Sequence, residues 1–165
     1  MIKPNSEYHG TWRHRGELEQ RARLIAIWQR SGWPKATASP QFGVIDFWLD
    51  LWTRIEAKGR DAKTLWIGAP GARGIIVAPW LPVTKYDAAC AHAAAGVWTG
   101  ALWHTFDLRD VALLPDVAAS AGDLFPRPAR DHEREGNRDP VLEIPIARLV
   151  VGWPKVIATI KAQGH

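Results

Sequence analysis

Apolar residues recur at helical spacing near the N-terminus of the chain. In residues 16–31 the side chains of Leu18, Ala22, Ile25 and Trp28 fall on one helical face. A glycine and a proline follow this stretch, as is typical of a helix end. The pattern predicts a first N-terminal helix over this segment.

A second and wider apolar stripe covers residues 40–58. Ser39 can cap a helix here, and Pro40 suits its first position. The apolar positions spread beyond about 100° of a helical projection, which predicts a second helix that is buried on most sides. Trp48 and Trp52 lie on this stripe and are therefore assigned to the core.

Strand-like runs follow in the middle of the chain. Residues 64–68 and 74–81 flank a Pro-Gly pair that suits a tight turn, so they predict a hairpin. Pro79 places the second of these strands at a sheet edge, because proline has no amide to donate. Trp66 is assigned to the core, and residues 101–106 predict a further strand.

The rest of the chain predicts two more helices and one more strand. A helix begins at Thr84 and contains the alanine-rich segment 88–95. Residues 141–151 alternate loosely between apolar and polar and contain Pro145, which predicts an edge strand. Residues 152–162 predict a terminal helix.

These elements predict one α+β domain over residues 1–165. Two N-terminal helices would pack on a small, mostly antiparallel sheet, and the alanine-rich and C-terminal helices would complete the layers. Residues 126–140 contain four arginines and four acidic residues but no large apolar residue. Such a segment cannot bury enough surface to stay ordered alone, so it predicts a mobile charged loop.

Composition and charge narrow the classes of partner. The chain has 165 residues, ten tryptophans and a formal net charge of +4, with seven basic and three acidic residues in its first 35. This charge is compatible with nucleic acid or an acidic protein surface. No secretory signal and no apolar run of about eighteen residues are evident, and the lone cysteine suits a reducing compartment. We therefore expect a cytoplasmic protein that does not span a membrane.

Basic residues beside aromatic ones suggest a binding surface, since this combination suits both nucleic acid and protein interfaces. We expect a small intracellular binding protein without catalytic activity, of the inhibitor or accessory-subunit type. Its partner would be nucleic acid, a nucleoprotein or a protein, including a second copy of itself. A structural subunit of a larger particle is an alternative. The candidate contact residues are Trp12, Arg13, Arg15, Arg30, Trp33, Lys35, Arg127, Arg130, Arg134, Arg138 and Trp153.

One short motif favours an enzyme instead. The string Tyr8-His9-Gly10-Thr11 resembles the His-Gly-Thr opening of ADP-ribosyltransferase folds of the diphtheria-toxin type. This resemblance implies an NAD-using transferase in which His9 binds the NAD ribose, Thr11 completes the motif and Glu143 is catalytic. The tyrosine that this family has in a later strand is missing near Phe42.

Other catalytic motifs are incomplete. The histidine at 132 lacks the second histidine of a zincin, and the glycine-rich segment 68–74 lacks the ending of a phosphate-binding loop. Asp139 and Glu143 have no neighbouring lysine, which a nuclease metal centre would need. We therefore expect neither a metal site nor a cofactor.

Overall fold

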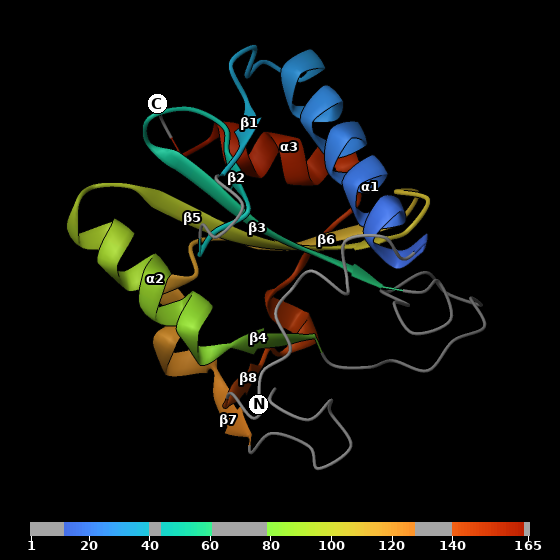
Figure 1. The fold of residues 1–165 in the computed structure, drawn as a ribbon. Helices are drawn as coiled ribbons and strands as arrows, with labels where there is room; N and C mark the ends of the chain where they lie inside the picture. Colours follow the sequence, from blue (N-terminus) through green and yellow to red (C-terminus); the bar gives the residue numbers. More distant parts are fainter. Residues whose placement is uncertain (1–11, 40–43, 61–78, 128–139, 164–165) are drawn as a thin grey trace, which may run out of the picture.

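The computed structural model describes residues 12–39, 44–60, 79–127 and 140–163 (Figure 1). Its central feature is a six-stranded sheet with the order β1-β2-β3-β5-β6-β9. β3 and β5 are parallel, and the other neighbouring strands of this sheet are antiparallel. The fold is mixed α+β with a mostly antiparallel sheet, which confirms the predicted class. The strands are β1 (Thr37–Ala38), β2 (Phe47–Trp48), β3 (Thr53–Arg60), β5 (Trp98–Thr105), β6 (Val111–Leu114) and β9 (Val150–Val151).

Helices cover both faces of the six-stranded sheet, with α1 and α3 on one face and α2 on the other (Figure 1). Leu24 of α1 and Val156 of α3 belong to the same buried cluster as Leu102 of β5. Ala89 of α2 belongs to a second cluster with Trp103. Because successive side chains of a strand point to opposite faces, β5 contributes to both clusters. The helices are α1 (Trp12–Arg30), α2 (Val83–Ala94) and α3 (Trp153–Lys161).

A smaller antiparallel sheet with the order β4-β8-β7 extends the core on the α2 side. Leu81 of β4 and Ile144, which follows β8, are fully buried in the cluster that contains Trp103. The strands are β4 (Trp80–Pro82), β7 (Phe125–Arg127) and β8 (Val141–Glu143), and the short 3-10 helices are η2 (Ala118–Asp123) and η3 (Ile146–Arg148).

The predicted helix over residues 40–58 is wrong. From residue 44 onward, where the structure describes this segment, the chain forms the β2–β3 hairpin. Phe47 and Leu49 are buried, whereas Trp48 between them is exposed, which is the two-residue period of a strand. A dense run of apolar residues fits both the helical and the strand period, so the apolar pattern predicted a helix where the chain forms strands.

The two tryptophans of this hairpin are surface residues. Trp48 and Trp52 are 41% and 46% exposed, so their predicted core assignment is wrong. Asp50 turns the chain between the strands, because its Oδ1 accepts a hydrogen bond from the amide of Trp52 at 2.8 Å. Trp66, which is also predicted to be in the core, lies outside the described residues.

Several other predicted elements are confirmed. α1 covers the helix predicted at 16–31, α2 the helix from Thr84, β5 the strand at 101–106, and α3 the terminal helix. The single edge strand predicted at 141–151 is wrong.

In that segment β8, η3 and β9 follow one another, and Pro145 sits in the extended conformation just before η3. Proline lacks the amide that a continuous strand would need to donate. Most of the predicted hairpin at 64–68 and 74–81, and most of the loop at 126–140, lies outside the described residues.

Candidate functional site

A nearly buried glutamate marks the middle of β3. Glu56 is 3% exposed, and its neighbour in register on β5 is the small residue Ala101. Burial, with a further contribution from the nearby Asp46 carboxylate, raises the pKa of Glu56 to about 7 against the opposing effect of Lys58 and Lys85. A buried carboxyl with a perturbed pKa is a physical indicator of a functional site.

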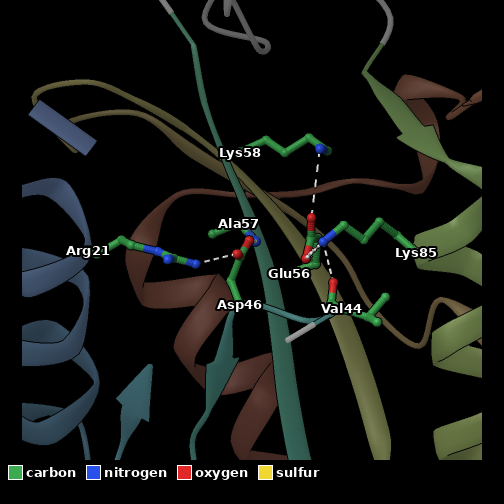
Figure 2. Close-up of polar contacts among 7 residues, drawn as sticks. All are labelled: Arg21, Val44, Asp46, Glu56, Ala57, Lys58 and Lys85. Atoms are coloured by element: carbon green, nitrogen blue, oxygen red, sulfur yellow. Dashed lines mark hydrogen bonds and ion pairs between the residues drawn. The ribbon is translucent and has the colours of Figure 1, made fainter. Parts of the chain in front are cut away.

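Asp46 lies opposite Glu56 across the β2–β3 ladder. Phe47 pairs with Ile55, and the same antiparallel register continued by one residue places Asp46 beside Glu56. The Oδ2 atom of Asp46 accepts a hydrogen bond from the amide of Ala57 at 3.0 Å, and Oδ1 accepts one from the Arg21 guanidinium of α1. The Asp46 carboxylate is therefore fixed from two sides (Figure 2).

Two lysines neutralise the buried glutamate. Nζ of Lys58 lies 3.7 Å from Oε1 of Glu56, and Nζ of Lys85 lies 3.1 Å from Oε2. Lys58 is two residues beyond Glu56 on β3 and therefore shares its face of the sheet. Lys85 comes from α2 and also donates a hydrogen bond to the backbone carbonyl of Val44 (Figure 2).

Four segments of the chain thus converge on one mixed-charge cluster, which we call the carboxylate cluster. It comprises Arg21 of α1, Asp46 before β2, Glu56 and Lys58 of β3, and Lys85 of α2.

Two chemical abilities follow from this arrangement. A carboxyl whose pKa is near 7 can exchange a proton at neutral pH. The Lys85 ammonium is bound by a carboxylate oxygen and a backbone carbonyl oxygen, which are ligands that hard divalent cations also take. Within the described ranges no group of three or more His, Cys, Asp or Glu residues is arranged to hold a metal ion.

A group of exposed apolar side chains lies on the hairpin that carries Asp46 and Glu56. We call it the hairpin patch, and it comprises Val44, Trp48, Leu51 and Trp52. The Arg54 guanidinium carbon lies 4.8 Å from the centroid of the Trp48 ring, in a cation–π arrangement. Contiguous exposed apolar residues of this kind often mark contact surfaces.

Of the predicted contact tryptophans near the ends of elements, Trp33 is buried and Trp153 is half-buried. Trp33 is 8% exposed and contacts the edge of Trp28, which Trp153 contacts from α3. The Trp153 indole donates a hydrogen bond to the carbonyl of Leu108 at 2.8 Å. The structure therefore brings Trp33 and Trp153 together around Trp28 as packing residues, and a contact role for them stays a prediction that their burial disfavours.

The charged candidates are spread over several elements. Arg30, the last residue of α1, and Lys35, five residues later, are exposed, and Glu143 is half-buried on β8. The backbones of Trp12, Arg13 and Arg15 lie in α1 and that of Arg127 in β7, with their side chains outside the described set. Five further candidates lie outside the described residues, namely His9, Thr11, Arg130, Arg134 and Arg138.

The sequence interpretation missed the carboxylate cluster because it assigned a helix to residues 40–58. On a helix the side chains of Glu56 and Lys58 point in different directions, whereas on a strand they share a face. A Glu-x-Lys triplet in a strand with period-two burial, one hairpin turn after an aspartate, is the signal that would have found this site. A lysine close to an acidic residue, as a nuclease metal centre needs, is present here and absent at Asp139 and Glu143.

Comparison with known proteins finds no matching protein family, no matching curated protein and no matching solved structure. None of the helices in the described part of the chain is long and apolar enough to cross a bilayer.

Proposed function

We propose that this protein is a divalent-cation-dependent hydrolase that cleaves phosphodiester bonds in nucleic acid. Asp46 and Glu56 would hold the cation, and Lys58 would contact the phosphate that is cleaved. The observation that carries this proposal is the cross-strand carboxylate pair with a lysine two residues beyond it on the same strand face.

The carboxylate pair suits a magnesium-type site. Mg²⁺ is usually bound by one or two carboxylates, with water and substrate phosphate oxygens completing its coordination. Asp46 and Glu56 provide two carboxylates, and a cation bound there would displace the Lys85 ammonium from Oε2 of Glu56 and from the carbonyl of Val44. A bound cation would supply a water of lowered pKa and would offset charge on the phosphate.

The residues of the chain have separable roles in this proposal. A water oxygen bonds to phosphorus while the ester P–O bond breaks, and a proton ends on the leaving oxygen. Lys58 and Lys85 place positive charge where the phosphate gains negative charge in the transition state. Arg21 holds the Asp46 carboxylate in place through its hydrogen bond. The net charge of +4 favours approach of a polyanionic substrate.

Cleavage of end-labelled DNA and RNA tests the proposal. The wild type should release products with Mg²⁺ and none with EDTA, while Asp46→Asn and Glu56→Gln should lower the rate by at least about 100-fold. Asp123→Asn is the matched control, because Asp123 lies on η2 in a separate ion pair with Arg148. Circular dichroism checks that each variant is folded.

Two results would contradict the proposal. Either no nucleic acid is cleaved under any divalent cation, or Asp46→Asn and Glu56→Gln cleave at the wild-type rate.

The hairpin patch favours a second candidate function, a binding protein without catalytic activity. In that case nucleic acid should bind with an affinity that falls steeply with added salt, and no divalent cation should induce cleavage.

A further inference from the structure

Trp48 of the hairpin patch and Glu56 of the carboxylate cluster lie on the same face of the β2–β3 hairpin. Trp48 pairs with Arg54 across the ladder, and Glu56 lies two residues beyond Arg54 on the same face of β3. Two residues along a strand correspond to about 7 Å. The exposed Trp48 ring therefore lies one step from the carboxylates that we propose to act on a phosphate.

The ring of Trp48 is held on one side and exposed elsewhere. Arg54 lies over it at 4.8 Å, and Nη1 of Arg54 donates hydrogen bonds to the carbonyls of Asp50 and Thr53. These hydrogen bonds restrain the Arg54 guanidinium, which therefore holds a fixed position over one face of the Trp48 ring. Trp48 nevertheless keeps 41% of its surface exposed.

The charges on this face suit phosphates. Arg54, Lys58 and Lys85 bring three cationic groups to the side of β3 that faces α2. An aromatic ring next to a row of cations is the combination that binds single-stranded nucleic acid, since bases stack on the ring and phosphates contact the cations. A base inside a duplex is already stacked on both sides and is not available to the ring.

We infer that Trp48 is a stacking platform for an unpaired base of a single-stranded nucleic acid, next to the phosphate at Asp46 and Glu56. Arg54 positions the ring and contributes positive charge to the bound strand. The inference rests on the proposed function and specifies its substrate class.

Fluorescence anisotropy with a fluorescein-labelled single-stranded oligonucleotide in EDTA tests the platform without cleavage. Trp48→Ala should weaken binding roughly tenfold or more, whereas Trp48→Phe should stay within a few-fold of the wild type because it keeps an aromatic face. Phe125→Ala is the matched control, since Phe125 is an exposed aromatic residue on β7 of the other sheet. This control should leave affinity unchanged.

Two further probes separate base stacking from charge. An abasic oligonucleotide of the same length keeps the phosphates and loses the bases, so Trp48→Ala should not weaken its binding. A blunt duplex should likewise bind Trp48→Ala and wild type alike.

Two results would overturn the inference. Either Trp48→Ala binds the normal oligonucleotide as tightly as the wild type does, or it loses as much affinity for the abasic strand or the duplex as it loses for the normal oligonucleotide. Failure of the proposed function is a different result, namely Trp48-dependent binding with no cleavage by the wild type in Mg²⁺.

Discussion

At the scale of single residues, Glu56 accounts for most of the unusual chemistry of this protein. Its carboxyl is buried, faces a second carboxylate at Asp46, and is opposed by the ammonium groups of Lys58 and Lys85. The two lysines reduce the cost of burial but do not remove it, because the pKa of Glu56 stays near 7. The fold maintains this costly arrangement, as expected of a functional site.

The raised pKa of Glu56 predicts how stability depends on pH. The pKa is about 7 in the folded state against an ordinary 4.5, so between these values the folded protein binds a proton that the unfolded chain has released. The free energy of unfolding should therefore fall as pH rises from about 4.5 to 7, on the order of 3 kcal/mol from this group. Burial is the main cause of the raised pKa, the Asp46 carboxylate adds to it, and the Lys58 and Lys85 ammonium groups oppose it.

Urea unfolding in EDTA at several pH values checks this prediction. Glu56→Gln should gain stability relative to the wild type as pH rises through this window, with little further change above pH 7 or so. If the free energies of unfolding of the wild type and Glu56→Gln differ by the same amount from pH 4.5 to 8, burial of Glu56 does not raise its pKa.

Gly100 supplies a second prediction at the residue scale. A Cβ at this position of β5 would lie 2.8 Å from the Trp98 ring and 3.0 Å from Leu113. Gly100→Ala should therefore overpack the core and lower the free energy of unfolding by about 1–3 kcal/mol.

Gly122→Ala is its control, because a Cβ there meets nothing within 4 Å. It should change stability by less than about 0.5 kcal/mol in the same urea experiment. Equal effects of the two substitutions would mean that Gly100 is not closely packed.

At the scale of elements, the β2–β3 hairpin connects the structure to the proposed function. One face of the hairpin packs Phe47 and Ile55 into the core, and the other carries the exposed Trp48 and the buried Glu56. α1 and α2 then reach this hairpin from the two sides of the sheet through Arg21 and Lys85 (Figure 2). The hairpin is therefore the element on which the whole site depends.

Two tryptophan substitutions test this assignment of faces. Trp28 of α1 is fully buried between Trp33 and Trp153, so Trp28→Ala should cost about 3–5 kcal/mol of stability. Trp52→Ala, at an exposed position of the hairpin, should cost no more than about 1 kcal/mol. Thermal and urea unfolding measure both, and a large loss for Trp52→Ala would favour the buried helix that the sequence pattern predicts.

At the scale of the whole molecule, sequence patterns predicted the elements whose period is unambiguous. α1, α2 and α3 follow helical spacing with recognisable ends, and β5 is an apolar run of strand length. The hairpin was missed because both of its faces carry apolar residues. Phe47 and Leu49 are buried, whereas Val44, Trp48 and Leu51 are exposed. The sequence cannot distinguish an apolar contact surface from a buried stripe.

The candidate site was missed for the same reason. Asp46 and Glu56 are ten positions apart in the sequence, and only strand pairing brings them together. The parallel pairing of β3 with β5, and the placement of α2 on the sheet, are long-range features that fix Lys85 beside Glu56. No local pattern encodes such contacts, so the composition favoured a binding protein and left the carboxylate cluster undetected.

The Mg²⁺ dependence of the cleavage rate tests directly whether Asp46 and Glu56 hold the cation. Initial rates on a labelled single-stranded oligonucleotide should rise with Mg²⁺ and saturate in the wild type and in Asp123→Asn. Asp46→Asn should need at least about tenfold more Mg²⁺ for half its maximal rate, as expected when a ligand is lost. An unchanged Mg²⁺ requirement in Asp46→Asn, or cleavage that needs no divalent cation, would contradict the account.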